Sequence, residues 1–301
     1  MIDGRTDPRV VTVMVLAQRC PQVLEALSRA CDVPGLRMLV HLDAKESLDG
    51  YASGRSFPDG LEFIDERHQV FWGGFSMIRA TEALARRALE DSSCEACVLV
   101  SDDTLPLVPA VRIRRELLDR PDRIDVGLTR RNPPYLRRWT EFFFLDSPMT
   151  SARPIATELR AADAASLEAM RRLERLRARG KHPFTEVWGG SQWWSLGRDS
   201  LRACLDGLSD EWVRESFEFS AVPDELAFQT LHANRLGLSA RSFTGPMLTD
   251  MGREPMPFVF RRAEELPSQR EGKLFVRKVA PEAGESMMAE IRATWEAGGH
   301  A

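Results

Sequence analysis

The sequence predicts an α/β fold in which a mainly parallel central sheet is flanked by helices, formed as a single domain with a C-terminal extension. Short apolar segments alternate with amphipathic ones through the first half of the chain. The segment CVLVS (97–101) is apolar along nearly its whole length, which is typical of a central strand covered on both faces. The 301 residues, 43% of them hydrophobic and 29% charged, suffice for one large globular unit.

The first half of the chain supplies the sheet in regular order. We expect strands at 10–17, 37–42, 61–65, 97–101 and 123–128, with helices between them at 21–31, 76–90 and 109–118. Ligands bind at the carboxyl ends of parallel strands, so polar residues at those ends are candidate site residues.

The second half is less regular. Residues 130–154 have no clear period, and an Ala/Leu/Arg-rich helix is expected over 156–179. A strand at 187–196, helices at 198–208 and 223–235, and a strand at 272–279 follow. We expect a catalytic domain over 1–280 and a C-terminal helix over 281–301 packed on it.

Charge and composition exclude several classes of protein. Lys and Arg number 41 against 45 Asp and Glu, a net charge of −4, so there is no basic excess for nucleic-acid binding. No apolar run reaches the ~18 residues of a membrane-spanning helix. Five cysteines are an odd number, and the C-x-x-C of Cys94 and Cys97 leads into a strand, which favours reduced thiols. We expect a cytoplasmic protein.

Three segments place polar or flexible residues at strand ends. Asp43 in HLDAK (41–45) is a nucleotide ligand or a turn former. Gly73 in VFWGGFS (70–76) permits close approach of a ligand or makes a tight turn. In SDDTLPL (101–107), Asp102 and Asp103 repel one another, which a bound cation or a set of donors would relieve; a solvated turn is the alternative.

Three later segments also carry candidate residues. WGGSQWWSL (188–196) has tryptophans suited to sugar faces, although one of them is expected in the core. Glu225 in PDELAFQTLHANR (223–235) is a candidate general base or one acid of a helix N-terminus. GKLFVRKV (272–279) alternates apolar and basic residues. Either one basic side chain points into the protein, where an anion such as a diphosphate would have to meet it, or the segment is an edge strand whose basic side chains reach water.

In this order, the segments resemble the core-2/I-branching β-1,6-N-acetylglucosaminyltransferase family, which includes protein xylosyltransferases. HLDAK and WGGFS match its H-x-D-x-K and W-G-G-x-S patterns, and SDDTLPL partly matches S-G-x-D-x-P-L. GSQWWSL, DELAFQT and LFVRKV match G-S-x-W-x-x-L, D-E-x-x-x-x-T and L-F-A-R-K-F. The resemblance covers Val10 to about Val279.

The resemblance implies an A-type glycosyltransferase fold, inverting chemistry, a UDP-sugar co-substrate, most simply UDP-GlcNAc or UDP-xylose, and no metal or other cofactor. Glu225 matches the catalytic base. The implied donor site comprises Asp43, Trp72, Gly73, Ser101, Asp102, Asp103, Arg261, Arg262, Arg277 and Lys278. Trp193 and Trp194 match the wall around the sugars, and the acceptor is expected at Tyr135, Arg137 and Arg138, where a solvated loop is equally compatible.

Two departures from the family pattern keep alternatives open. Thr104 stands where the family usually has Asp, and Asp102 replaces the usual Gly. A metal-dependent transferase using Asp102 and Asp103, or a non-catalytic sugar-binding relative, are therefore the alternatives. The chain lacks the membrane anchor of animal members, so we expect a bacterial enzyme, cytoplasmic or peripheral on the inner membrane, that acts on a glycan or lipid-linked saccharide in surface polysaccharide synthesis.

Overall fold

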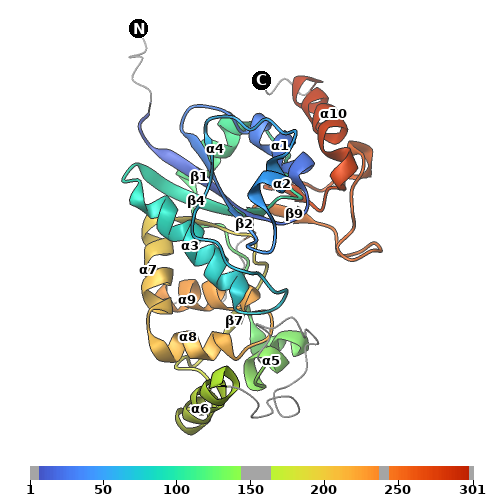
Figure 1. Ribbon diagram of the computed structural model, residues 1–301. Helices are drawn as coiled ribbons and strands as arrows, with labels where there is room; N and C mark the ends of the chain where they lie inside the picture. Colours follow the sequence, from blue (N-terminus) through green and yellow to red (C-terminus); the bar gives the residue numbers. More distant parts are fainter. Residues whose placement is uncertain (1–6, 144–163, 237–243, 298–301) are drawn as a thin grey trace.

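The computed structural model describes residues 7–143, 164–236 and 244–297 (Figure 1). A five-stranded sheet in the order β3-β2-β1-β4-β8 forms its centre. The strands are β1 (Val10–Ala17), β2 (Leu36–Leu42), β3 (Leu61–Phe63), β4 (Cys94–Ser101) and β8 (Ser195–Gly197). The first four are parallel, and β8 pairs antiparallel with β4. The predicted α/β fold with a mainly parallel sheet is confirmed.

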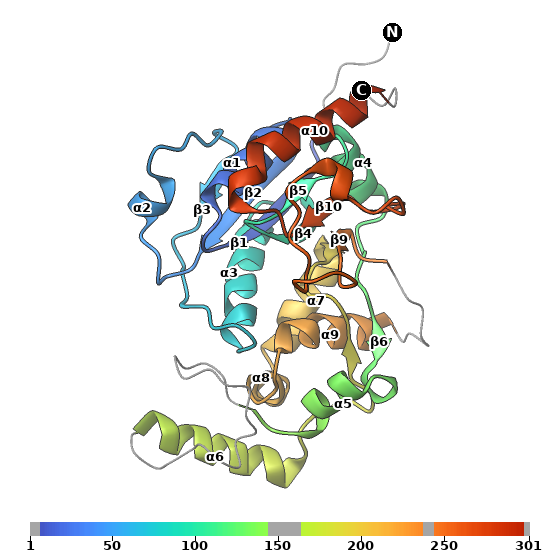
Figure 2. The same ribbon diagram turned by 90° about the vertical axis from the view of Figure 1, so that its right-hand side faces the viewer.

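Helices cover both faces of this sheet, which explains why its central strands are apolar throughout. The helices α1 (Pro21–Ala30) and α4 (Ala110–Asp119) lie on one face, and α3 (Ser76–Glu90) and α7 (Arg198–Leu208) on the other (Figure 2). Val13, Met14 and Val15 at the centre of β1 are fully buried. The C-terminal helix α10 (Gly284–Ala297) packs against α1.

Smaller elements extend the molecule beyond the carboxyl ends of the strands. A three-stranded sheet has the order β5-β10-β9, and β6 pairs with β7. These strands are β5 (Leu105–Pro106), β6 (Gly127–Leu128), β7 (Trp188–Gly189), β9 (Met247–Thr249) and β10 (Phe275–Arg277). The other helices are α2 (Leu48–Ala52), α5 (Pro133–Thr140), α6 (Ala164–Arg179), α8 (Glu211–Glu218) and α9 (Ala227–Leu236), with short 3₁₀ helices η1 (Thr129–Arg131), η3 (Pro223–Glu225), η4 (Ala263–Glu265) and η5 (Pro281–Ala283).

Several second-half expectations are wrong in detail. The strand expected at 187–196 is interrupted between β7 and β8. In this interval the chain passes close to its neighbour and needs a glycine, because a Cβ on Gly190 would lie 1.9 Å from the carbonyl oxygen of Asp125. The strand expected at 123–128 is reduced to β6 and a single bridge from Arg123 to Ser195. The irregular segment contains α5, which begins with two prolines that favour a first helical turn.

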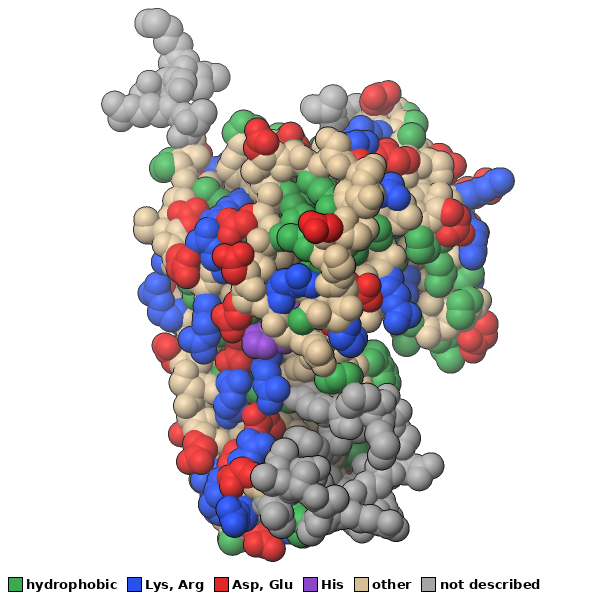
Figure 3. All heavy atoms as spheres, viewed as in Figure 1, with side chains coloured by type: hydrophobic (Ala, Val, Ile, Leu, Met, Phe, Trp, Pro, Cys, Tyr) green, Lys and Arg blue, Asp and Glu red, His purple; other side chains and the backbone are tan. Residues whose placement is uncertain are grey.

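Of the long helix expected over 156–179, the structure describes α6; residues 156–163 lie outside the described part. All five cysteines are free thiols, and the Sγ atoms of Cys94 and Cys97 lie 3.6 Å apart. No helix among the described residues combines the length and apolarity that crossing a bilayer requires. Basic and acidic side chains are interspersed over the face shown in Figure 3, with no large area of one sign.

Candidate functional site

A cavity of about 820 Å³ opens at the carboxyl ends of the central strands. Leu16 and Ala17 at the end of β1 line it, as do Asp43 after β2 and Asp102 after β4. Between β1 and β4 the strand order reverses, since the chain builds β1, β2 and β3 outward before it returns to add β4. This switch point is where open α/β sheets bind their ligands.

The cavity brings together most of the site residues predicted from the sequence. Tyr135 and Arg138 come from α5, Glu225 from η3, and Arg277 and Lys278 from the end of β10. The predicted residues that line the cavity are Asp43, Trp72, Ser101, Asp102, Asp103, Tyr135, Arg138, Trp193, Glu225, Arg277 and Lys278. Segments far apart in sequence therefore converge on one chamber.

Gly73 and Trp194 do not line the cavity. Gly73 has φ 75°, which makes the tight turn, and its carbonyl oxygen accepts a hydrogen bond from Val222 N–H at 2.8 Å. Gly73 thus supports the segment that carries Glu225. Trp194 is fully buried and its ring packs 4.8 Å from that of Phe228, so it belongs to the core and only Trp193 faces the chamber.

Three predicted arginines also lie away from the cavity. Arg137 points from the exposed side of α5, whereas Arg138 on the same helix faces inward. Arg261 and Arg262 are exposed, and all three of these outlying arginines pair with a surface glutamate. Of the four basic residues in the implied donor site, Arg277 and Lys278 line the cavity.

The Glu225 carboxylate is held by a cation on α5, since Arg138 Nη1 donates to Glu225 Oε2 at 2.5 Å. Burial and the Glu225 charge raise the pKa of Tyr135. The backbone of Glu225 is fixed as well, because its carbonyl oxygen accepts Gly190 N–H at 3.0 Å. Glu225 lies in a 3₁₀ turn before α9, not in the α-helix expected over 223–235.

Asp224, next to Glu225, is in a different environment. Its side chain is buried and does not line the cavity, and its Oδ1 has no hydrogen-bond partner among the residues that the structure describes. Burial, and then the charge of Glu225, raise the pKa of Asp224 from 3.8 to about 7. The two adjacent acids therefore differ: Glu225 reaches the chamber as part of an ion pair, and Asp224 favours its neutral form up to about neutral pH.

Protein donors relieve the repulsion expected between Asp102 and Asp103. Asp102 Oδ2 accepts the backbone N–H groups of residues 18, 19 and 20 at 2.8–2.9 Å and the Tyr51 hydroxyl at 2.9 Å. It thereby holds the chain that enters α1. Asp103 pairs with Arg277 at 3.2 Å and accepts the hydroxyl of Ser101. Among the described residues, no three His, Cys, Asp or Glu side chains gather as they would to hold a metal ion.

The opposite wall of the chamber is basic and aromatic. The Arg277 guanidinium lies 4.4 Å from the centre of the Trp193 ring, which fixes both side chains. In the described part of the chain, the Lys278 ammonium has neither an ion pair nor a hydrogen bond. The strand ends at Arg277, so the expected alternation of faces does not extend to Lys278, and both cations line the cavity.

At the end of β2, Asp43 is nearly fully buried and bonds to Lys45, whose Nζ lies 2.8 Å from Oδ2. His41 Nε2 accepts the N–H of His68 at 2.9 Å, and burial lowers the pKa of His41 to about 4. His41 is therefore a neutral structural residue at neutral pH. Asp43, in contrast, lines the cavity and stays a candidate site residue.

Sequence reasoning missed several lining residues. These are Gln18, Asp125, Gln192, Lys273, Met251 and Met256, among others. Gln18 directly follows β1, so the rule of strand carboxyl ends would have found it. Trp72, Met251 and Met256 are exposed by 76%, 59% and 59%, which makes the mouth apolar. No local sequence pattern identifies Met251 and Met256 as lining residues, because they reach the cavity only through the tertiary packing of the segment between β9 and β10.

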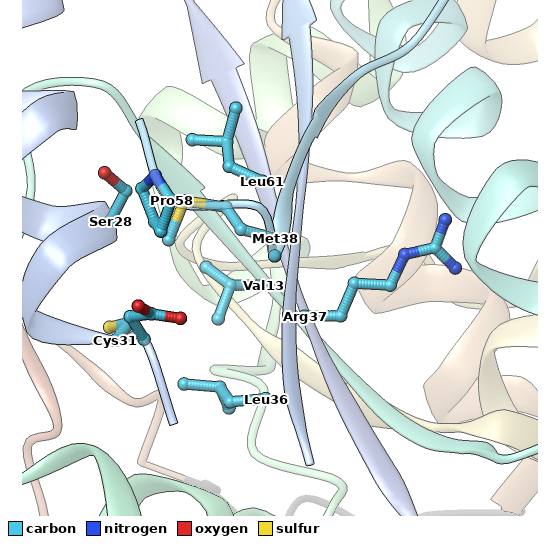
Figure 4. A pocket seen from close by; sticks show the side chains of 10 residues that line it. Val13, Ser28, Cys31, Leu36, Arg37, Met38, Pro58 and Leu61 are labelled. Atoms are coloured by element: carbon cyan, nitrogen blue, oxygen red, sulfur yellow. The ribbon is translucent and has the colours of Figure 1, made fainter. Parts of the chain in front are cut away.

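A second pocket, of about 10 Å³, lies near the amino ends of β2 and β3 (Figure 4). Val13, Met38 and Leu61 contribute apolar side chains to it and Ser28 a polar one, whereas the side chain of Arg37 extends away from it. A space of this size holds about one water molecule. It offers no room for a substrate, so the large cavity is the candidate active site.

Comparison with known proteins agrees with this geometry. The family model described as Core-2/I-Branching enzyme matches residues 13–248, well over half of the chain. The match spans β1 through β9 and so includes the switch point, Glu225 and the Trp193 loop. A search of curated proteins finds no match. The mainly parallel sheet with helices on both faces is consistent with an A-type glycosyltransferase fold, and the chain belongs to the core-2/I-branching family of glycosyltransferases.

Proposed function

We propose that this glycosyltransferase transfers a sugar with inversion from a UDP-sugar to a hydroxyl group of a glycan acceptor, without a metal ion. One observation carries the proposal: the carboxylate of Glu225 and the ammonium of Lys278 line the same cavity at the switch point of the sheet. A proton acceptor and an anion-binding cation are the two groups that such a displacement requires.

The donor lies along the carboxyl ends of β1, β2 and β4. Asp43 is suited to accept hydrogen bonds from the uracil or ribose, since its carboxylate lines the chamber after β2. The diphosphate lies against Lys278 and Arg277. Lys278 meets it as an unpaired cation, and Arg277 is held in place by Asp103 and by the ring of Trp193.

The contacts of the acidic pair support the metal-independent form of the proposal. Asp102 is directed at the N-terminus of α1, and Asp103 is paired with Arg277. A cation bound by both carboxylates would have to displace these donors. In their present arrangement, Lys278 and Arg277 supply the positive charge that a divalent cation supplies in other sugar-nucleotide transferases.

The reaction is a single displacement. Glu225 removes the proton from an acceptor hydroxyl, whose oxygen bonds to the anomeric carbon of the donor. The bond from that carbon to the diphosphate oxygen breaks, and UDP leaves with the electron pair beside Lys278. A positioned base contributes ~10²–10⁴-fold to such a step. Trp193 offers an apolar face to the transferred sugar, for which GlcNAc and xylose are the first candidates.

We place this activity in the bacterial cytoplasm or at the inner face of the membrane, in the synthesis of a surface polysaccharide. The five free thiols support a reducing compartment. The acceptor then approaches the side of Glu225 that α5 forms.

A screen of UDP-sugars tests the proposal. The matching donor should raise the melting temperature, because it binds only the folded state, and should release UDP slowly in water. Turnover should persist in excess EDTA. No stabilisation by any uridine nucleotide would refute the proposed donor class, whereas loss of turnover in EDTA would favour a metal-dependent transferase. Binding of glycans without UDP release on any donor would indicate a sugar-binding protein.

A further inference from the structure

The candidate base is not free in this structure. Arg138, on α5, holds the carboxylate of Glu225, and its contact occupies Oε2 at 2.5 Å. An acceptor hydroxyl must hydrogen-bond to Glu225 before it can give up its proton. An acceptor hydroxyl that bonds to Oε2 therefore has to compete with Arg138 for the same oxygen atom.

The backbone under Arg138 is well anchored, so this exchange needs only a side-chain rotation. Lys181 Nζ donates to the carbonyl oxygen of Arg138 at 2.7 Å. The Arg138 guanidinium lies 4.9 Å from the centre of the Tyr135 ring. That ring is in turn packed on the chain at Gly189, where an added Cβ would come within 2.9 Å of it. Tyr135 is thus a fixed platform, across which the guanidinium can turn.

Arg138 also has binding capacity to spare. It donates to Glu225 through Nη1, while in the described part of the chain its Nε and Nη2 have no hydrogen-bond partner. Its side chain is 24% exposed and lines the cavity. A guanidinium with two open donors binds an oxyanion such as a carboxylate or phosphate in a bidentate manner.

We propose that the acceptor carries an oxyanion near its accepting hydroxyl, and that this group binds the open Nε and Nη2 of Arg138, turns the guanidinium away from Glu225 and so releases the base. The inference rests on the proposed function, since it names the class of acceptor for the same site. A neutral hydroxyl competes poorly with a carboxylate for a guanidinium, because the charge-assisted bond is stronger. An anionic acceptor offers Arg138 an equivalent partner and leaves Glu225 for the reacting hydroxyl.

The other charged groups nearby are consistent with this exchange. Asp224 is the second acid close to Arg138, and burial together with the Glu225 charge favours its neutral form. The Asp103 carboxylate is already paired with Arg277. Lys273, on the cavity wall, adds positive charge, and its Nζ binds only the carbonyl oxygen of Gly245 among the described residues. The chamber is therefore suited to a second anion besides the diphosphate.

Matched glycosides test the inference on the full chain loaded with UDP. The probes are p-nitrophenyl β-glucuronide, β-glucoside and β-glucoside 6-phosphate, which differ only at carbon 6, and the corresponding galactosides. Calorimetry should show the acidic probes binding ~10- to 100-fold more tightly than the neutral ones. The carboxylate and phosphate probes distinguish a uronic acid from a phosphorylated sugar as the source of the oxyanion.

Arg138→Gln should abolish this preference while the affinity for UDP stays the same. The matched control is Arg130→Gln, which removes an arginine from another Arg–Glu pair, that with Glu186 at 2.6 Å, outside the cavity. It should retain the preference. With the UDP-sugar found in the screen, Arg138→Gln should slow transfer to acidic acceptors and speed transfer to neutral ones, because its Glu225 is no longer paired.

Equal binding of acidic and neutral probes by the unaltered protein, including no binding of either, would overturn the inference. So would an equal loss of transfer to both kinds of acceptor in Arg138→Gln. If UDP binds and the acid preference is absent, only the inference fails. If UDP does not bind, the proposed function fails and the inference falls with it.

Discussion

The substitution Lys278→Gln tests the proposed binding of the diphosphate by itself, because it leaves the other proposed site residues unchanged. Lys278 lines the cavity, and within the described residues its ammonium has no carboxylate partner. The substitution therefore leaves no acid unpaired, and the melting temperature should stay within a few degrees. A hydrogen bond to a charged group contributes ~1.5–3 kcal/mol, so the affinity for UDP should fall ~10- to 100-fold. Turnover should fall further, because charge grows on the diphosphate in the transition state.

Calorimetry with UDP and with uridine measures the effect. Lys278→Gln should weaken UDP binding and leave uridine binding unchanged, since only the diphosphate reaches the ammonium. Arg262→Gln is the control, because Arg262 also belongs to the donor site that the family resemblance implies, but it is exposed and paired with Glu264 at 3.2 Å. Equal losses for uridine and UDP, or an equal effect of Arg262→Gln, would refute the assignment of the diphosphate to Lys278.

Three further substitutions test the remaining roles. Glu225→Gln should lower turnover ~10²–10⁴-fold, while UDP still binds within about twofold in calorimetry; retained activity would move the base elsewhere. Arg277→Gln should lower the free energy of unfolding by ~1–3 kcal/mol, because it leaves the Asp103 carboxylate without its cation. An unchanged midpoint of unfolding in urea would contradict this. Burial raises the pKa of Asp224 in the folded protein from the ordinary 3.8 to about 7. The folded protein therefore holds this proton more tightly than the unfolded chain, and the free energy of unfolding should fall by up to ~4 kcal/mol as the pH rises from about 4 to about 7. Asp224→Asn should flatten that pH dependence, and an unaltered slope would show that Asp224 is ionised throughout.

The first half of the fold could be predicted because its signals are local. β1 and α3 have the expected bounds, and β2, α1 and α4 differ by a residue or two. In these segments most buried positions are apolar, and the period of burial matches the period of the element. The acids after β2 and β4 reached the cavity for the same reason, since strand ends of a parallel sheet meet at one edge.

The second half could not be predicted in the same way. Gly189 and Gly190 are needed where two segments pass close together, within the range 187–196 that was expected to be one strand. Trp193 and Trp194 are chemically identical neighbours, yet one faces the chamber and the other packs on Phe228. Which of them faces the ligand depends on α9, whose packing has no counterpart in the local sequence.

The residues of this chain by themselves determined the parallel sheet, the edge at which its cavity opens, and the motifs that place it among core-2/I-branching enzymes. Tertiary structure alone decided which charges neutralise one another. Asp102 is directed to the start of α1, Asp103 to Arg277 and Glu225 to Arg138, while Lys278 keeps its charge for a ligand. An ion pair depends on a few ångströms between segments that lie tens or hundreds of residues apart, and hydrophobic periodicity carries no information about such distances.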